Sequence, residues 1–225
     1  MSFQDKLLDS FIAFEQVIDL DNPVHTVRKN ALKRFESDGF PTKKDELWKY
    51  TSLKSIIQKD YSLSVKSNPN VGLKDIEKYS INDIDSYKIV FVDGVFNPFL
   101  SNTTHDGMDI CVLSAALSKT KYKKTITKYF NKIVPDDQSL ASLNTSYTKE
   151  GAYIHIPKSV LPEDPVQILH FSSGKNKPLW LQPRNIIIVE ENARVEIIER
   201  HQSLRSHDGA TNSLTCLLYT SDAAD

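Results

Sequence analysis

Apolar residues recur at steps of three and four along three stretches of the first 135 residues, which is the period of one helix face. Charged side chains occupy the positions between them, so each predicted helix has an apolar and a polar face. The predicted helices cover residues 3–18, 23–38 and 121–133. Asn22 and Gly39 are residue types that favour the start and the end of the second helix. These patterns predict an N-terminal part built mainly of helices.

Between the second and third helices the pattern is less regular. A Gly-Phe-Pro turn is followed by a capping pattern that predicts a short helix within residues 42–50. Residues 58–85 are polar and are predicted to form loop with short helices. Residues 87–96 predict a β-hairpin, because an Asp-Gly pair between two apolar runs accepts the positive φ of a type I′ turn. Residues 110–113 are predicted as a further strand.

The pattern changes at Gly151, where the regular stretches become short, rich in β-branched residues and separated by Pro, Asn and Gly. Four strands are predicted there, at residues 152–156, 166–171, 186–190 and 195–199. Their spacing is irregular and no motif recurs, so a short sequence repeat is not indicated. A small apolar β layer leaves open edges, and we therefore expect it to stack on further strands. The predicted fold class is α+β, with helices first and strands second.

Composition excludes several classes of protein. The 225 residues carry 28 basic and 29 acidic side chains, a net charge of −1, so no overall field attracts nucleic acid or an anionic membrane. The sequence shows neither a membrane-length apolar run nor a signal peptide, and we expect a cytoplasmic protein. Two cysteines, Cys111 and Cys216, are too few and too far apart for a disulfide framework or a CxxC metal site.

Acidic side chains lie close together in sequence at three places: Asp75 and Glu77, Asp136 and Asp137, and Glu190 and Glu191. Neighbours in sequence do not define a cleft, and the second pair is interpreted as the cap of a helix. A catalytic carboxylate pair is therefore not predicted.

The histidines lack the spacing of a metal site, since neither HExxH nor HxH occurs. They are His25, His105, His155, His170, His201 and His207. His155 and His170 alternate with apolar strand residues, which indicates a solvent-facing or hydrogen-bonded strand position. No single histidine is predicted to be a metal ligand.

Other candidate features have simple structural interpretations. Cys111 lies in an apolar run and is predicted to be a small buried hydrophobe. Nucleotide binding and a serine nucleophile are not indicated, because GxGxxG, GxxxxGK[ST] and GxSxG motifs are all missing. The lysine run within residues 121–132 is interpreted as a solvated helix face. For Trp48 and Trp180, interface anchoring and core filling both stay open.

Four blocks of sequence together resemble one protein family. They are Ala31-Leu32-x-x-Phe35 with Gly39-Phe40-Pro41-Thr42-x-x-Asp45-Glu46-x-Trp48-Lys49-Tyr50-Thr51-x-Leu53, then Ile89-Val90-Phe91-Val92-Asp93-Gly94-x-Phe96, then Leu143-Asn144 with Gly151 and Ile154-x-Ile156-Pro157, and last Arg184-Asn185-Ile186-Ile187-Ile188-Val189-x-x-Asn192-Ala193-x-Val195-x-Ile197-Ile198-Glu199-Arg200-His201. Taken together, they resemble the SufB/SufD family of iron–sulfur cluster assembly proteins, over about residues 10–215. The block with Gly-Phe-Pro and Trp-Lys-Tyr-Thr favours SufD over SufB, whereas the last block belongs to the shared core.

The resemblance implies a helical N-terminal domain, a right-handed parallel β-helix and a C-terminal helical region that docks a SufC-type ABC ATPase. It also implies that SufD and SufB pair through their β-helices. The predicted domains are a helix-rich domain with a small β-hairpin at residues 1–150, the first turns of the β-helix (solenoid) at 151–215, and a non-family tail at 216–225. We interpret that tail as the end of a truncated gene fragment, translated from non-genomic DNA such as a library adapter, which leaves Cys216 without a role.

The ATPase-docking helices and the late β-helix residues implicated in cluster formation, including a histidine of SufD, are expected to lie beyond residue 225. The resemblance therefore assigns no catalytic or cofactor-binding residue here and leaves metal ligands unknown, and neither His201 nor His207 is put in the place of the missing histidine. Thiolate ligation of a cluster is implausible with one family-compatible cysteine, so no cofactor is expected on this chain.

The resemblance predicts a non-catalytic subunit of an iron–sulfur cluster assembly scaffold, the SufBCD complex of the SUF system. Its expected partners are a SufB-like β-helix subunit and a SufC-like ABC ATPase, and it would aid iron acquisition while the complex handles the clusters. Two other functions stay open. A β-helix carbohydrate-active enzyme predicts a secretion signal and carboxylates clustered on one sheet face, and a helical adaptor protein would bind a partner through the lysine face of residues 121–132.

Overall fold

The computed structural model describes residues 1–63, 70–105, 107–135, 138–174 and 177–220. Its helices are α1 (Phe3–Glu15), α2 (Val24–Asp38), α3 (Lys54–Ile57), α4 (Leu73–Ile76), α5 (Leu113–Ser118), α6 (Thr120–Tyr129) and α7 (Ser139–Ser146), with short 3₁₀ turns η1 (Glu46–Trp48), η2 (Glu77–Tyr79) and η3 (Pro98–Leu100). Its strands are β1 (Tyr87–Val92), β2 (Val95–Phe96), β3 (Asp109–Val112), β4 (Ala152–Ile156), β5 (Val166–Ser172), β6 (Trp180–Leu181), β7 (Arg184–Val189), β8 (Ile197–Ser203), β9 (Ala210–Thr211) and β10 (Leu214–Tyr219).

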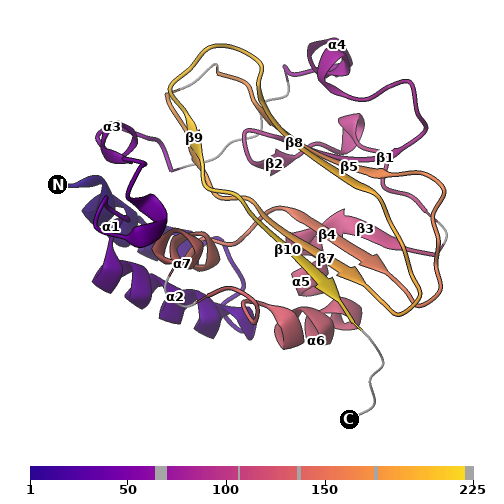
Figure 1. The fold of residues 1–225 in the computed structure, drawn as a ribbon, viewed down its shortest axis with the longest axis horizontal. Coiled ribbons are helices and arrows are strands. Elements are labelled where there is room, and N and C mark those ends of the chain that lie inside the picture. Colours follow the sequence, from indigo (N-terminus) through magenta and orange to yellow (C-terminus); the bar gives the residue numbers. More distant parts are fainter. Residues whose placement is uncertain (64–69, 106, 136–137, 175–176, 221–225) are drawn as a thin grey trace.

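The long strands form two sheets that face each other (Figure 1). One sheet has the order β2-β1-β5-β8 and the other the order β10-β7-β4-β3. From β4 onward, successive long strands fall alternately into the two sheets, and β5, β7, β8 and β10 each pair in parallel with a strand already in their sheet. Only β2 and β3, each at a sheet edge within the described part of the chain, pair antiparallel. The predicted α+β fold, with helices first and stacked strands second, is confirmed.

Period-2 alternation along these strands divides the apolar side chains between the inside and the outside of the sheet pair. Inward-facing residues of both sheets, among them Ile154, Ile168 and Ile187, form one buried cluster between the sheets. Outward-facing residues of the β4–β7–β10 sheet pack under α5 and α6, and Ile126 and Ile188 belong to that second cluster. The helices thus cover one outer face, and an apolar core lies between the sheets.

Helices α1, α2 and α7 lie together beside the strands (Figure 1). Helix α1 begins with a capping box, in which Ser2 and Asp5 bond each other's backbone amide. Aromatic side chains fill the space beneath, and the rings of Phe3 and Trp180 meet edge to face at 5.1 Å. Trp180 is therefore a core residue, which settles one of the two options left open from the sequence, whereas Trp48 is half-buried.

Helix α7 is tied to the strands by buried amide groups. Asn144 donates from Nδ2 to the backbone oxygens of Pro183, at 2.9 Å, and Asn212, at 2.7 Å. Asn212 in turn donates to the carbonyl of Leu140 at 2.9 Å. Because a buried amide without partners is costly, these bonds fix the position of α7 against the start of β7.

Most predicted elements are confirmed, with changes at their ends. The first helix stops at Glu15 rather than at residue 18, and the second matches its prediction closely. The hairpin turn has Asp93 at φ 51° and Gly94 at φ 78°, the two positive φ values of a type I′ turn. The helix predicted to residue 133 ends at Tyr129, because Asn131 takes a positive φ that breaks the helix before Pro135 is reached.

Several elements differ more strongly from the sequence prediction. Helix α5 was not predicted, because its six residues are too short for a periodic pattern to stand out. A helix was expected after the Asp136-Asp137 pair, but the extent of α7 was not predicted, since α7 has no clear amphipathic stripe. The strand predicted at 195–199 runs over Ile197–Ser203, so its polar second half belongs to the sheet. Residues of the predicted tail up to Tyr219 continue strand β10, and residues 221–225 lie outside the described residues, as does most of the predicted 67–70 loop.

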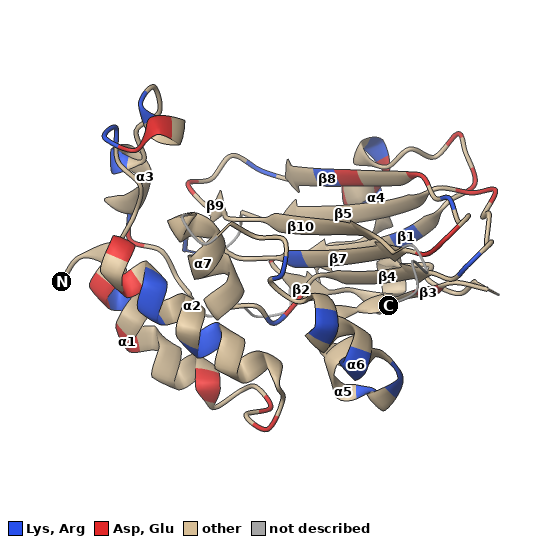
Figure 2. Ribbon diagram, turned by 60° about the horizontal axis from the view of Figure 1, so that its bottom comes forward, with Lys and Arg blue, Asp and Glu red and all other residues tan. Residues whose placement is uncertain are grey.

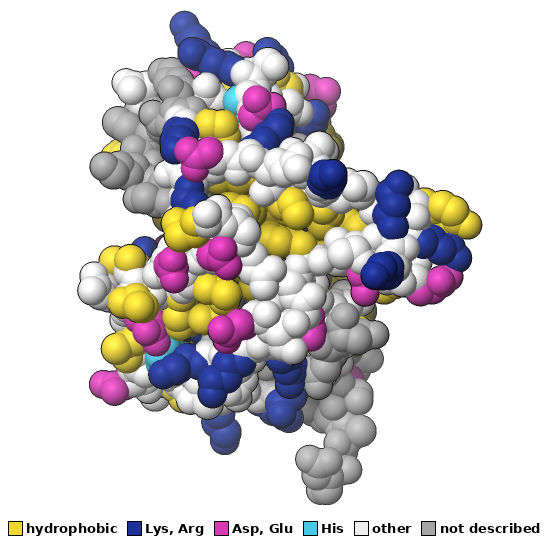
Figure 3. Space-filling view, turned by 90° about the vertical axis from the view of Figure 1, so that its left-hand side faces the viewer, with side chains coloured by type: hydrophobic (Ala, Val, Ile, Leu, Met, Phe, Trp, Pro, Cys, Tyr) yellow, Lys and Arg dark blue, Asp and Glu magenta, His cyan; other side chains and the backbone are white. Residues whose placement is uncertain are grey.

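The surface carries charges of both signs. Basic and acidic positions both occur on α1 and α2 in Figure 2, whereas α6 carries only basic ones. Charged and hydrophobic side chains intermingle on the face shown in Figure 3. This mixture agrees with the net charge of −1. Among the described residues, no helix is both long enough and apolar enough to cross a membrane.

Candidate functional site

A group of polar side chains lies between the two sheets at the β8 and β10 edges. This inter-sheet cluster consists of His170, Asn185, Glu199, His201 and Thr215. Glu199 and His201 are two positions apart on β8, so both side chains face the same side of the strand. The parallel register aligns His201 with His170 on β5, which brings the third member to them.

Glu199 is the centre of the hydrogen bonds in this cluster. Its Oε1 lies 2.8 Å from Nε2 of His201 and accepts from the Asn185 amide at 3.0 Å, and its Oε2 accepts from the Thr215 hydroxyl at 2.6 Å. Burial alone would raise the pKa of Glu199, but the bonds from His201 and Thr215 outweigh it and hold that pKa below its usual value. Glu199 is therefore an ionised, oriented carboxylate at physiological pH.

His170 is buried in a stack of rings between the sheets. Its ring lies against Phe91 at 4.8 Å and against His201 at 4.6 Å, nearly parallel to both. Burial lowers the pKa of His170 to about 3, and nearby His201 lowers it further, so the imidazole is neutral at physiological pH. Within the part of the chain that the structure describes, the buried Nε2 of His170 has no hydrogen-bond partner.

One ligand atom each from His170, Glu199 and His201 lies within 4.8 Å of the others. A hollow of about 110 Å³ adjoins both histidines and is also lined by Leu181 and Thr211. Two imidazoles and a carboxylate are a common ligand set for transition metals in proteins. Among the described residues, this is the group of histidines and acids that could hold a metal ion.

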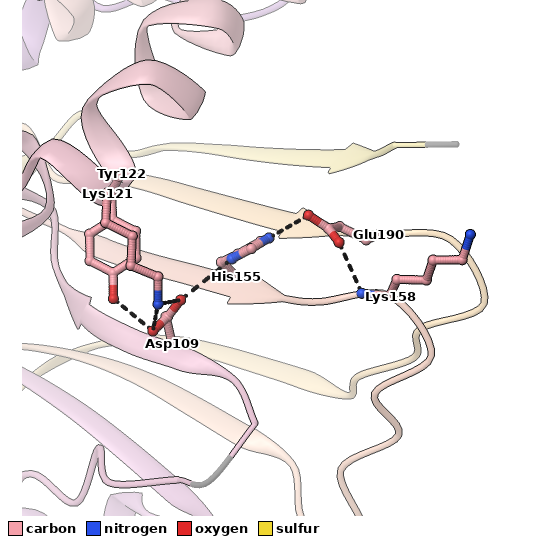
Figure 4. A network of polar contacts seen from close by, with 6 residues as sticks. All are labelled: Asp109, Lys121, Tyr122, His155, Lys158 and Glu190. Carbon is pink, nitrogen blue, oxygen red and sulfur yellow. Dashed lines mark hydrogen bonds and ion pairs between the residues drawn. The ribbon is translucent and has the colours of Figure 1, made fainter. Parts of the chain in front are cut away.

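A second polar network lies on the outer face of the β4–β7 sheet (Figure 4). Asp109 on β3 accepts from the Tyr122 hydroxyl at 2.6 Å and from the Lys121 ammonium at 3.0 Å. His155 on β4 lies between Asp109, 3.5 Å from Nδ1, and Glu190, 2.8 Å from Nε2. We call these residues the Asp109 network.

The Asp109 network joins α6 to the sheet that it covers. Burial would raise the pKa of Asp109, but hydrogen bonds from Tyr122 and Lys121 prevail and lower it. His155 occupies a hydrogen-bonded strand position, as predicted. With a lysine ammonium already on its carboxylate, the network is a structural ion-pair system.

The adjacent carboxylates predicted not to be catalytic each have separate partners. Glu190 bonds His155 and the backbone amide of Lys158, while Glu191 pairs with the Lys158 ammonium at 2.7 Å. Asp75 accepts from the amide of Gly72 at the start of α4. The Asp136-Asp137 pair lies outside the described residues.

The remaining candidates have local roles. His25 pairs with Glu15 at 3.1 Å, and Nδ1 of His207 accepts from the amide of Gly209. Cys111 is only partly buried, and burial raises the pKa of its thiol to about 11, so it is unreactive at neutral pH. His105 meets the ring of Tyr87 edge on at 4.8 Å.

Sequence reasoning missed the inter-sheet cluster. His170 is buried in a ring stack, where a solvent-facing position was one of the two predictions. A search for HExxH or HxH spacing cannot find ligands that come from two paired strands far apart in sequence. The available signal was Glu199-x-His201 at period two, but it needed the strand register to supply His170.

Known proteins match the larger part of this chain. A family model described as the SufBD protein N-terminal region matches residues 1–168. This chain belongs to the SufB/SufD family. An iron–sulfur cluster assembly SufBD family protein of Synechocystis sp. is 25% identical over 180 residues, which cover 80% of this chain and 39% of that protein. The SufD proteins of Escherichia coli and Bacillus subtilis are 24% and 25% identical, over 77% and 50% of this chain.

The chain spans about two fifths of the length of the first of these SufB/SufD relatives, and 38% of the Escherichia coli protein. The family resemblance seen in the sequence is thereby confirmed, including a role of relatives in iron–sulfur cluster assembly, which their names state. The family block with Gly-Phe-Pro and Trp-Lys-Tyr-Thr reaches the surface, where the side chains of Leu47 and Tyr50 are 76% and 90% exposed.

Proposed function

We propose that this chain is a SufD-type, non-catalytic subunit of a cytoplasmic scaffold that assembles iron–sulfur clusters. It pairs with a SufB-like subunit, works with a SufC-like ABC ATPase and aids iron acquisition. The cluster is cargo of the complex, not a cofactor of this chain. The observation that carries the proposal is the family match over residues 1–168 together with the SufD-like Gly-Phe-Pro and Trp-Lys-Tyr-Thr block.

The strand order supports a β-helical interpretation of residues 151–215. Successive long strands alternate between two sheets, in the order β4, β5, β7, β8 and β10. β7 pairs in parallel with β4, β8 with β5, and β10 with β7. That path describes successive coils of a solenoid, and right-handed crossovers are the strong rule for parallel strands. We propose that these coils are the start of the right-handed β-helix through which the subunit meets its partner.

The side chains of the described residues favour a scaffold over an enzyme. The carboxylates of the Asp109 network are engaged by Lys121, Tyr122 and His155. The Cys111 thiol has a raised pKa and cannot act as a thiolate at neutral pH. Neither arrangement offers a nucleophile beside an available base, which is what covalent or acid–base catalysis needs.

The test is a stoichiometric titration with a SufB-like chain and a SufC-like ATPase from the same source. We expect this chain to co-elute with the SufB-like chain in size-exclusion chromatography with light scattering. We also expect cluster yield, measured as bound iron and sulfide, to rise with added chain and to level off at equal amounts. A scaffold acts stoichiometrically, whereas an enzyme acts at small fractions of its partner.

The matched control is an unrelated parallel β-helix protein of similar net charge. Full cluster yield at catalytic amounts of the chain would contradict a non-catalytic role. A folded chain, judged by circular dichroism, that elutes apart from the SufB-like partner would contradict the pairing.

A further inference from the structure

We propose that His170, Glu199 and His201 bind one divalent transition-metal ion, of the Fe²⁺ or Zn²⁺ class, between the two sheets. This inference deepens the iron acquisition named in the proposed function, on which it rests, by assigning the residues of this chain that would hold the ion. The metal site can exist without partner binding and partner binding without the metal site. It rests on three observations: the ligand set, the geometry and an unpaired buried nitrogen.

The ligand set fits borderline metals. Neutral imidazole suits zinc, iron and copper, and two imidazoles with one carboxylate leave positions open for water or a further ligand. Mg²⁺ and Ca²⁺ prefer sites made of oxygen ligands.

The geometry needs a small contraction. The three ligand atoms lie within 4.8 Å of one another. Metal–ligand bonds of about 2.1 Å in a tetrahedral site place ligands about 3.4 Å apart. Glu199 and His201 lie on edge strand β8 and are partly exposed, so their side chains can move by the required distance of about 1 Å. His170 is buried and serves as the fixed ligand.

The surroundings orient the ligands as metal sites require. Asn185 and Thr215 donate to the two oxygens of Glu199, at 3.0 and 2.6 Å. Such bonds to a ligating carboxylate fix its direction and tune its basicity. The hollow of about 110 Å³ beside both histidines exceeds the roughly 30 Å³ of one water molecule, so water ligands have room on the histidine side of the site.

A purely structural role explains part of the cluster only. The 2.8 Å contact between His201 and Glu199 accounts for those two side chains as an ion pair. That ion pair does not explain Nε2 of His170, which is buried and has no partner among the described residues. A buried polar atom left unpaired destabilises the fold, and a metal ion bound to Nε2 would supply the missing partner.

The Asp109 network is a useful contrast. There, both ring nitrogens of His155 face carboxylates, and the Lys121 ammonium already neutralises Asp109 at 3.0 Å. A cation would have to displace that lysine. The inter-sheet cluster has no lysine or arginine within hydrogen-bond distance of Glu199 among the described residues, so the two histidine sites provide a matched pair for the test.

The experiment titrates the full chain, stripped of metal, with Co²⁺ and Zn²⁺, and with Fe²⁺ under anaerobic conditions. Co²⁺ binding is read from its visible ligand-field spectrum, and Zn²⁺ stoichiometry from calorimetry. We expect one equivalent to bind, Zn²⁺ to raise the Tm, and Mg²⁺ to do neither. His201→Ala and Glu199→Gln should each weaken binding at least tenfold, and Thr215→Val, which loses one bond to Glu199, about tenfold.

Two further variants keep the test decisive. His170→Phe retains the ring stack while removing the buried ligand, and should abolish the Co²⁺ spectrum in a chain that still unfolds cooperatively. His155→Ala, in the Asp109 network, should leave binding unchanged. The proposal is overturned if wild-type chain binds no metal, if Mg²⁺ binds as well as Zn²⁺, or if His155→Ala alone abolishes binding.

Discussion

Replacing Gly151 by alanine should destabilise the start of strand β4 more than any other glycine substitution of similar backbone geometry. Gly151 has φ +149°, and a Cβ there would lie 1.9 Å from the carbonyl oxygen of Arg184. Real Cβ atoms stay at least 3.0 Å from other heavy atoms, so the backbone must shift by more than about 1 Å. That backbone is fixed, because the amide of Arg184 donates to Glu150 at 3.0 Å and the Gly151 carbonyl accepts from Leu113 at 2.8 Å.

The magnitude follows from two effects. A strained positive φ costs about 1–3 kcal/mol, and overpacking in a tight interior costs about 1–3 kcal/mol more. Gly151→Ala is therefore expected to lower the free energy of unfolding by about 2–6 kcal/mol. Gly107→Ala is the matched control: its φ is +108°, but the nearest atom to its Cβ is 3.8 Å away, so only the strain applies.

The assay is urea unfolding of both variants and wild type, followed by far-UV circular dichroism. The difference between the two variants isolates the contact with Arg184 and should be at least about 1 kcal/mol. Equal losses in both variants would refute the reasoning, because the backbone contact between Gly151 and Arg184 would then cost nothing. Gly151 belongs to the family blocks, and this contact gives a physical reason for glycine there.

Three further predictions concern single side chains. Asn144→Ala should lower the free energy of unfolding by about 1–3 kcal/mol in the same assay, because the carbonyl of Asn212 loses the Asn144 amide and the carbonyl of Pro183 keeps only the amide of Leu214. An unchanged midpoint would contradict this. In a Cys216→Ser background, Cys111 of the folded chain should react with iodoacetamide at pH 8 at least about tenfold more slowly than Cys111 of the chain unfolded in urea, since burial raises its pKa to about 11. Equal rates would disprove its burial. The pKa of Asp109 is depressed on folding, so its contribution to stability is present above its unfolded pKa of 3.8 and is lost as pH falls through the folded pKa. Asp109→Asn should therefore flatten the acid limb of the Tm–pH curve. An identical acid limb would count against the network.

Local patterns were sufficient to predict the elements that carry strong periodicity. The helix at 23–38, the hairpin around Asp93 and the strand at 152–156 were each predicted within a residue or two. Elements held by tertiary contacts were missed. Helix α7 is almost entirely buried, so its polar residues, such as Asn144 and Thr145, face the interior and hide the amphipathic pattern. Strand β8 was placed too early, because its second half is polar on the face that forms the inter-sheet cluster.

The candidate site shows why the metal ligands could not be predicted from spacing. Alternation along β8 fixes only that Glu199 and His201 share a face. Whether a third ligand joins them depends on which residue of β5 lies opposite, and the observed register sets His170 there. A slip of one residue would place Leu169 or Phe171 opposite His201 and turn the His170 side chain to the outer face of the sheet. Val166 and Ile168 face the inter-sheet core, while Leu169 and Phe171 pack in a second cluster on the outer face, so β5 is apolar on both faces. The alternation of apolar residues therefore does not fix the register of β5, and the strand pairing that assembles the site cannot be seen in one sequence.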